Sequence, residues 1–339
     1  SPPPGMLRFN TDIGRLEVWR NDHWATILGE SPNLGDQNQT NSAGGTGTRG
    51  LFLGGFAPGP ITYDVVDYIT ISTLGNAQDF GDFTAGTRFG AACSSSTRAL
   101  YGGGLNPGVT ATIEFFTISS TGDATDFGDL TDSRHGNSAG SSSTRGIWTG
   151  GYDPTTKDVI DYVTMASTGD AVDFGNLSTS RKQQLGTACS SVRCVQGGSE
   201  GGASDSDVLD YITTSTLGNA QDFGDLTSGG DSAGNDGGCS NSTRGLFKYA
   251  RQGPASVNNI DFITIASTGN AQDFGDVSTG TGGGAALSSP TRGVFAAGTP
   301  SGDDMTFATI ATTGNTVDFG ELSVSRSQMS GASNGHGGL

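Results

Sequence analysis

The chain has few of the residues on which metal sites, catalytic triads and nucleic-acid interfaces depend. It contains three histidines and three lysines in 339 residues, and its formal net charge is -17. The histidines, His23, His135 and His336, share no register, so the sequence offers no histidine metal cluster and no Ser/His/Asp triad. The negative charge would repel a phosphate backbone, and the 14 arginines are scattered rather than clustered. We therefore expect no nucleic-acid partner, no metal and no cofactor.

Long apolar runs are also missing from the sequence. No segment approaches the roughly 20 apolar residues that a membrane-spanning helix needs. Residues 1–5 have neither the charged nor the apolar region of a secretory signal. We expect no membrane insertion, and delivery outside a cell would then use another route.

Cysteine is scarce as well, with four in the chain. That number is too small for a disulfide scaffold in a chain of this length. Cys93, Cys189 and Cys239 each precede a Ser-rich turn, at a position where other copies of the repeat described below have Gly or Leu. This pattern predicts a packed small or apolar position. A bridge between Cys189 and Cys194 is a conceivable alternative.

In place of these features the chain has a repeated unit of nearly fifty residues. Its centre, Asp-Phe-Gly, occurs six times at intervals of 45 to 51 residues. The copies lack helical periodicity, and 57 glycines with short β-branched and aromatic runs indicate strands and tight turns. Such a period is typical of propeller blades. We therefore predict an all-β fold, a six-bladed, kelch-like β-propeller with four-stranded blades. The motif aspartates are Asp79, Asp126, Asp173, Asp222, Asp273 and Asp318.

Each repeat divides into four expected strands, a to d. Strand a follows Thr-Arg and commonly ends in paired glycines, strand b is the Asp-Tyr-Ile-Thr-Ile run, strand c contains Asp-Phe-Gly, and strand d ends at Ala-Ala-Cys-Ser. We expect strands a to d of one repeat to form one blade, with the glycines of strand a near the axis. Residues 41–45 and 326–333 both resemble a strand d. We favour the second as the strand that completes blade six.

Residues 1–34 lie outside the repeat and predict a small N-terminal β-hairpin module. Alternating runs at 6–10 and 16–20 flank a turn that contains Gly14, and a third run at 23–28 could extend the sheet. So small a sheet is marginal alone, so we expect it to anchor on a partner or on the main domain, through Phe9, Trp19 and Trp24. Residues 35–47 read as a linker and 48–339 as the propeller.

The connections between strands a and b vary from copy to copy, whereas the b–c and d–a turns barely change. In an antiparallel blade the a–b and c–d connections share one face, and the other two share the opposite face. Binding sites usually lie on loops held by a rigid scaffold. We therefore predict binding of a receptor or partner on the a–b face, through Phe56, Tyr63, Tyr152, Lys157, Tyr249 and Arg251.

Charged residues also recur in register. A Thr-Arg arginine occurs in each repeat and a strand-b acid in five of them, which predicts arginine–carboxylate links within or between blades, with an arginine cluster for an anionic sugar as the alternative. A carboxylate or amide also recurs at every third position, as in Asn76, Asp79 and Asp82. Calcium binding is one interpretation, but residues three apart on a strand point to opposite faces, so turn capping and interblade pairing are favoured. The arginines are Arg49, Arg98, Arg145, Arg193, Arg244 and Arg292, and the acids are Asp67, Glu114, Asp161, Asp210 and Asp261.

Two catalytic interpretations of the repeat find no support in the residues. A kinase would need a Gly-rich loop, a strand lysine and a His-Arg-Asp loop, and none of these accompanies Asp-Phe-Gly here. Glycoside hydrolysis needs a pair of carboxylates, and no position stands out among so many aspartates. We therefore expect no enzymatic activity.

Two stretches resemble known proteins. Residues 5–19, Gly-Met-Leu-Arg-Phe-Asn-Thr-Asp-Ile-Gly-Arg-Leu-Glu-Val-Trp, resemble the hairpin module of tail-fibre and other virion structural proteins of bacteriophages, especially phages of marine cyanobacteria. The repeats, with Asp-Tyr-Ile-Thr-Ile and Ser-Ser-Ser-Thr-Arg-Gly, are similar to the kelch-like repeats of the same virion proteins. Together the two resemblances cover nearly the whole chain. The Tyr and Trp signature of kelch blades is missing, so the propeller prediction depends on period and strand count.

The resemblance implies a component of the virion surface in a fibre, a tail appendage or a head decoration. We expect attachment to the host surface, contact with other virion proteins through residues 1–34, and a homo-oligomer. A structural decoration protein that stabilises the particle is the first alternative, and a polysaccharide depolymerase is the second.

Overall fold

The computed structural model describes residues 6–10, 15–20, 23–26, 48–200, 206–230, 237–249, 251–252, 255–278, 284–296, 298 and 302–339. The chain separates into two compact units, residues 1–37 and 38–339. In the first, β1 (Leu7–Asn10) pairs antiparallel with β2 (Arg15–Arg20), and β2 pairs with β3 (His23–Thr26). The expected linker at 35–47, and with it the strand-like segment 41–45, lies outside the described residues.

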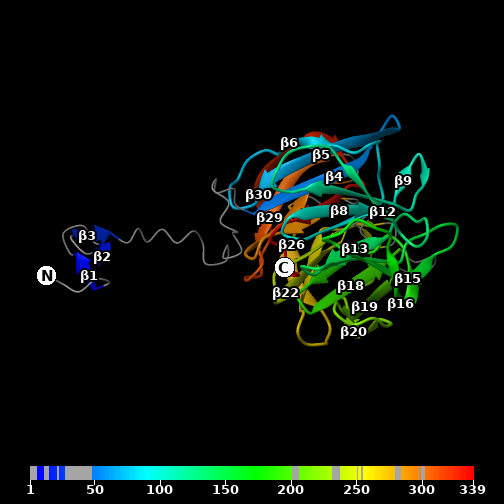
Figure 1. Ribbon diagram of the computed structural model, residues 1–339. Helices are drawn as coiled ribbons and strands as arrows, with labels where there is room; N and C mark the ends of the chain where they lie inside the picture. Colours follow the sequence, from blue (N-terminus) through cyan, green and yellow to red (C-terminus); the bar gives the residue numbers. More distant parts are fainter. Residues whose placement is uncertain are drawn as a thin grey trace. The chain divides into compact units, whose positions relative to one another are not determined.

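The second unit is a six-bladed β-propeller, which confirms the predicted fold (Figure 1). Its described residues form six four-stranded antiparallel sheets and contain no helix, so no helix is available there to cross a membrane. Blade I is β31 (Ser330–Ser333), β4 (Arg49–Ala57), β5 (Ile61–Thr70) and β6 (Gln78–Asp82). Blade II is β7 (Ala91–Ser94), β8 (Arg98–Gly102), β11 (Thr112–Thr117) and β12 (Thr125–Asp129). Blade III is β13 (Ser138–Ser141), β14 (Arg145–Thr149), β15 (Lys157–Thr164) and β16 (Val172–Arg181).

The remaining blades follow the same order. Blade IV is β17 (Gly186–Cys189), β18 (Arg193–Ser199), β19 (Ser206–Thr213) and β20 (Gln221–Asp225). Blade V is β21 (Gly238–Ser240), β22 (Arg244–Lys248), β25 (Asn259–Thr264) and β26 (Gln272–Asp276). Blade VI is β27 (Ala286–Ser288), β28 (Arg292–Ala296), β29 (Gly302–Thr309) and β30 (Val317–Arg326). Two short hairpins extend a–b connections, β9 (Leu105–Asn106) with β10 (Gly108–Val109) and β23 (Arg251–Gln252) with β24 (Ala255–Ser256).

The predicted assignment of strands to blades was wrong by one strand. Strand d of each repeat pairs with strand a of the next repeat, as β7 does with β8, and it is the innermost strand, in contact with its counterparts in both neighbouring blades. The glycines of strand a therefore do not line the axis. The C-terminal segment does supply the closing strand, but β31 pairs with β4 and completes blade I rather than blade VI.

The Asp-Phe-Gly motif joins each blade to the b–c turn of the next. Phe80 is buried in the core between blades I and II, and Gly122 of the next turn donates its backbone N–H to the Phe80 carbonyl at 2.8 Å. Gly81 has a φ of 149°, and a Cβ there would lie 2.4 Å from the Gly122 carbonyl oxygen. The side chain of Asp123 accepts the N–H of Asp82 at 3.1 Å. All six blade junctions repeat this contact, including Asn76 with Glu321 at ring closure, so the interblade pairing predicted for these residues is confirmed.

The Thr-Arg arginines also join neighbouring blades, but not through carboxylates as predicted. The guanidinium of Arg49 lies over the ring of Tyr68 in its own blade, 4.6 Å from the centroid. Its Nη1 donates to the carbonyl of Ile118 in the next blade at 2.8 Å. The other five arginines do the same, each over a Tyr or Phe ring and each bonded to a carbonyl of the next blade.

The strand-b acids pair instead with residues of the c–d segment that leads from the preceding blade into the acid's own blade. Asp67 accepts hydrogen bonds from the hydroxyl of Ser323 at 2.6 Å and lies 3.1 Å from Arg326 Nη1, with both charged side chains fully buried. Arg134–Asp161 and Arg181–Asp210 form the same ion pair at 2.7 Å. Glu114 and Asp261 also accept a threonine hydroxyl of the preceding blade, and among the described residues neither forms an ion pair with an arginine. Burial lowers the pKa of Arg181 and Arg326, and the facing aspartates oppose that shift.

The innermost strands are fastened to one another by a ring of serines around a narrow axial cavity of about 50 Å³. In this ring the hydroxyl of each serine donates to the backbone carbonyl of its counterpart in the neighbouring blade, as Ser141 does to Ser94 at 2.7 Å. Five junctions carry this bond, and the residues that donate are Ser94, Ser141, Ser240, Ser288 and Ser333.

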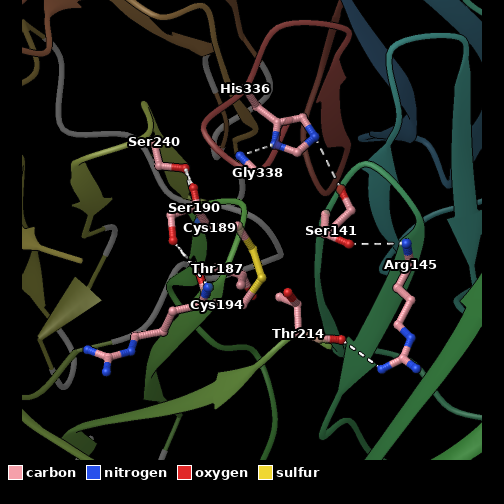
Figure 2. Close-up of a disulfide and its surroundings, with 12 residues drawn as sticks. Ser141, Arg145, Thr187, Cys189, Ser190, Cys194, Thr214, Ser240, His336 and Gly338 are labelled. Carbon is pink, nitrogen blue, oxygen red and sulfur yellow. Dashed lines mark hydrogen bonds between the residues drawn. A yellow bond between two sulfur atoms is a disulfide. The ribbon is translucent and has the colours of Figure 1, made fainter. Parts of the chain in front are cut away.

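Cys189 occupies the sixth serine position, and Figure 2 shows it bonded to Cys194 on the neighbouring strand. The register places Ala188, not Cys189, at the position of Cys93 and Cys239, so the predicted register of Cys189 was wrong by one residue. The disulfide that the sequence left as an alternative is present. Cys93 and Cys239 are buried free thiols at a packed position, as predicted, and burial raises the pKa of Cys239 to about 12.

The segment after β31 lies against this ring, next to the junction without a serine (Figure 2). His336 Nε2 lies 2.8 Å from the carbonyl oxygen of Ser94 and 3.2 Å from the hydroxyl of Ser141. Its Nδ1 accepts the N–H of Gly338 at 3.1 Å, so the ring is neutral with its proton on Nε2. Gly337 donates to the carbonyl of Ser240 at 2.9 Å. Burial lowers the pKa of His336, and the hydrogen bond to the Ser94 carbonyl opposes that shift.

We expect acid to weaken this contact. The pKa of His336 is lower in the folded state than its ordinary 6.5, so its contribution is complete above pH 6.5 and is lost as the pH falls below that value. Between pH 7.5 and 5 the loss reaches at most about 2 kcal/mol. Urea unfolding of the wild type and of His336→Gln at both pH values measures it: the difference between the two proteins should shrink at pH 5. A difference that stays constant would show that the imidazole does not titrate with unfolding.

Candidate functional site

The face that carries the a–b and c–d connections has a regular backbone frame with irregular side chains. At three junctions, between blades VI and I, I and II, and II and III, a c–d residue forms an antiparallel bridge with an a–b residue of the next blade. His135 and Tyr152 exchange both backbone hydrogen bonds, at 3.2 and 2.8 Å. Ser327 pairs in this way with Phe56, and Arg88 with Leu105. The backbone of the frame is therefore common to these three junctions, while the side chains that it presents differ at each one.

A second row lies one residue further along the c–d segments, on the side of the inner strands. The N–H of Phe89 donates to the Gln328 carbonyl at 3.2 Å, Gly136 donates to Phe89, and Gln183 donates to Gly136, both at 2.7 Å. All four residues have a left-handed backbone, with φ between 49° and 64°. Glycine adopts this conformation without strain, whereas a bulky side chain such as that of Phe89 costs about 1–3 kcal/mol. Residues held in such a conformation occur preferentially at functional sites.

Aromatic rings and cations alternate over this frame, from blade I toward blade IV. The guanidinium of Arg88 lies 4.1 Å from the ring centroid of Phe56 and 5.8 Å from that of Phe89. The ring of His135 lies 5.9 Å from Phe89 and 5.6 Å from Tyr152. We call this set the ring-and-cation arc; it consists of Phe56, Arg88, Phe89, His135, Tyr152 and Lys182, with Lys182 Nζ 5.1 Å from the centroid of Tyr152. Each of the six side chains is half-buried.

The charges of the arc are unevenly neutralised. Lys182 lies 3.5 Å from the carboxylate of Glu200. Arg88 makes no ion pair among the described residues; its Nη1 donates to the neutral side chain of Gln328 at 3.3 Å. Burial lowers the pKa of His135, and the nearby cations Lys182 and Arg88 add to that shift while Asp153 opposes it. The imidazole is therefore neutral at pH 7, and its buried Nδ1 has no hydrogen-bonding partner among the described residues.

The arc offers groups that can bind a ligand. Half-buried rings offer apolar faces, and Arg88 offers planar N–H donors beside them. Asp153 accepts the hydroxyl of Ser133 at 2.8 Å, and Glu200 pairs with Lys182, so both nearby carboxylates already have partners. Within the part of the chain that the structure describes, no three His, Cys, Asp or Glu side chains could hold a metal ion.

The residues predicted for this face are divided between the arc and other places. Phe56 and Tyr152 belong to the arc. Tyr63 lies in β5, opposite Gly55, and is half-buried. Lys157 forms an ion pair with Asp132 at the edge of blade III.

Two of the predicted residues do not serve as exposed contacts. Tyr249 was expected on an exposed loop, but it is fully buried and donates to Asp261 at 2.6 Å. It takes the place that an arginine has at other junctions, and burial together with this bond raises its pKa. The backbone of Arg251 lies in β23, and its side chain is outside the described residues.

Four members of the arc, Arg88, Phe89, His135 and Lys182, were not predicted from the sequence. They lie on the c–d connections, which share the face of the a–b loops. The prediction depended on variation among the a–b loops and did not include the c–d connections. The signal was present in the residues that follow the strand-c acids, because these triplets read Thr-Arg-Phe, Arg-His-Gly and Arg-Lys-Gln at successive junctions. Departure from the repeat, rather than loop length, marks these positions.

In the N-terminal unit the rings of the predicted anchoring residues Trp19 and Trp24 are in contact, 5.3 Å apart and edge to face. The guanidinium of Arg8 lies 4.2 Å from the Trp24 centroid. Phe9 is opposite Leu16 in the β1–β2 pair. The anchoring role of these residues stays a prediction.

Comparison with known proteins supports the fold alone. No family model matches the chain, and no curated protein sequence matches it. Among the 307 chains of solved structures that match is one titled "Structure of YjhT". It has a TM-score of 0.59 and 11% sequence identity, and the match covers 74% of this chain and 88% of that one. At such low identity the likeness shows only that the two chains share the propeller architecture.

Proposed function

We propose that this chain is a non-enzymatic protein of the bacteriophage virion surface, in a tail fibre or appendage, and that its propeller attaches the particle to the host. The observation that carries the proposal is the ring-and-cation arc. The opposite face repeats the same turns at every blade, whereas the arc breaks the repeat on a uniform backbone frame. A scaffold repeated six times needs no such variation for stability.

Several further observations support this assignment. Phe89 keeps a strained backbone although Gly136 shows that glycine fits the same position. The resemblance of residues 5–19 and of the repeats to virion proteins is the reason for proposing a location on a particle. In this proposal residues 1–34 join the propeller to other virion proteins, and the protein acts as a homo-oligomer.

A structural decoration protein is the second candidate, and one observation favours it. The b–c and d–a face exposes large apolar side chains, namely Leu74, Val192 and Leu217, each between 56% and 61% exposed. Such side chains could pack on a capsid or tail protein. A polysaccharide depolymerase is the third candidate, without a residue that favours it.

Cell binding by the isolated protein tests the attachment role. Fluorescently labelled wild type should bind cells of at least one strain in a panel of cyanobacteria. Phe89→Gly should reduce that binding at least tenfold while changing the free energy of unfolding by no more than about 1 kcal/mol, because relief of backbone strain offsets the lost ring contacts. Val192→Thr, which restores the residue of other repeats on the opposite face, is the control and should bind as the wild type does.

Two results would contradict the proposal. Equal cell binding by Phe89→Gly and wild type would remove the arc from the attachment site. A cryo-electron microscopy map of the particle with the arc buried against another virion protein would favour the decoration role instead.

A further inference from the structure

The cation near the blade I end of the arc, Arg88, has an unusual environment for this chain. Each Thr-Arg arginine is bonded to a carbonyl, and Arg134, Arg181 and Arg326 face buried aspartates. Arg88 has neither kind of partner among the described residues. It donates one hydrogen bond, to Gln328 at 3.3 Å, although a guanidinium has five N–H donors.

Arg88 is also partly removed from water. Its side chain is half-buried between the rings of Phe56 and Phe89, and burial lowers its pKa without the opposing carboxylate that Arg181 and Arg326 have. A partly desolvated guanidinium with unused donors gains most from a planar anion, because a carboxylate accepts two parallel N–H bonds. Such a contact is screened by salt less than one between fully exposed charges.

The groups beside Arg88 favour a ligand that also has apolar faces. Phe89 and Tyr152 flank the neutral ring of His135, and Lys182 lies beyond Tyr152. A pyranose ring has C–H faces that pack on aromatic rings and hydroxyls that can reach polar side chains. A row of rings with a cation near each end therefore matches a short run of sugars that carries a carboxylate.

We propose that the arc binds a carboxylated saccharide, a polymer that contains uronic acids, with Arg88 bonded to a sugar carboxylate and the rings of the arc packed on the sugar faces. This inference rests on the attachment role proposed above and adds the chemical class of the receptor. It also explains how a chain with a net charge of -17 can bind an acidic polymer. The contact is local, at a cation that has no ion-pair partner in the part of the chain that the structure describes.

The test uses the full-length protein and isothermal titration calorimetry with tetramers of galacturonate, mannuronate and guluronate. At least one should bind, and its methyl ester, which keeps the sugar but removes the charge, should bind at least tenfold more weakly. Arg88→Gln should lose at least tenfold in affinity for the acid form, and Arg88→Lys should lose less. Val192→Thr, on the opposite face, is the control and should stay within twofold of wild type. Unfolding midpoints of all variants verify that they fold.

The contrary outcomes separate this inference from the attachment role. Equal affinity for acid and ester, or equal affinity of Arg88→Gln and wild type, overturns the carboxylate while the arc can still bind a neutral sugar. If no uronate binds but labelled protein still binds cells, the saccharide class is wrong and the attachment role stands. If neither uronate nor cells bind, both proposals fail.

Discussion

Replacing Asp67 with alanine should lower the free energy of unfolding by about 3–5 kcal/mol, one of the largest single-residue effects that we expect in this protein. The carboxylate lies where the ring closes, fully buried, with Arg326 and Ser323 as its partners. Its removal leaves the guanidinium of Arg326 charged, buried and without an ion pair. The urea midpoint and the slope of the unfolding transition, followed by circular dichroism, measure the effect.

Glu114→Ala is the matched control for this experiment. Glu114 occupies the same position in blade II and accepts the hydroxyl of Thr84 at 2.6 Å, but it forms no ion pair with an arginine among the described residues. The loss of free energy of unfolding should therefore be about 1–2 kcal/mol, because the variant removes the acceptor of the Thr84 hydroxyl and leaves no buried charge without a partner. A double variant, Asp67→Ala with Arg326→Met, should recover part of the loss because it removes the uncompensated charge. Equal losses for Asp67→Ala and Glu114→Ala would contradict a special contribution of the ion pair.

Replacing Gly128 with alanine should lower the free energy of unfolding by about 3 kcal/mol or more. Gly128 belongs to the Asp-Phe-Gly motif of blade II, has a φ of 147°, and lies so close to blade III that a Cβ would be 2.5 Å from the Gly169 carbonyl oxygen. Alanine would combine backbone strain of about 1 kcal/mol or more with a clash against backbone atoms that cannot turn away. Thermal or chemical unfolding detects the change.

Gly169→Ala separates the two causes. Gly169 has nearly the same backbone, with a φ of 153°, but a Cβ at this position would meet no atom within 4 Å beyond its chain neighbours. This variant carries the strain without the clash and should lose about 1 kcal/mol. If the two variants lose the same amount, the close approach of the blades at Gly128 contributes nothing to the requirement for glycine.

The repeat period and strand propensities were enough to predict the propeller, because six copies of one unit leave few other ways to bury their apolar faces. They did not determine which strands pair. Only residues 95–97 separate β7 from β8, whereas residues 83–90 separate β6 from β7. The shorter connection favours a hairpin, so it indicated that strand d joins the next repeat. Our prediction followed the order of the motif instead.

The partners of the arginines could not be deduced in the same way. Arg49 donates to the backbone carbonyl of Ile118, and because every residue has such a carbonyl, the sequence cannot identify it as the partner. The repeated aspartates, by contrast, can be recognised in the sequence, but they are not the partners of these arginines. The position of Cys189 shows a related limit. A shift of one residue on a strand changes the face to which a side chain points, and only the pairing of Cys189 with Cys194 fixes that register.

The candidate site was partly predictable. Loop variation identified the correct face and two members of the arc, Phe56 and Tyr152. Burial of Tyr249 could not be foreseen, because its hydroxyl binds Asp261 where an arginine binds the equivalent aspartate at other junctions. Nothing in the sequence indicates that a tyrosine replaces the arginine there. The left-handed backbone of Phe89 is a property of three-dimensional structure alone.

Closure by β31 also has a consequence for the order of events during synthesis. The inner edge of β4 pairs with residues 330–333, which leave the ribosome after the other described strands of the propeller. Until then the backbone groups of that edge are unpaired, and an unpaired edge is a template for another chain. Joining segments nearly 280 residues apart also carries a large loop-closure cost. Of all the blades, the first to emerge is the last to be completed.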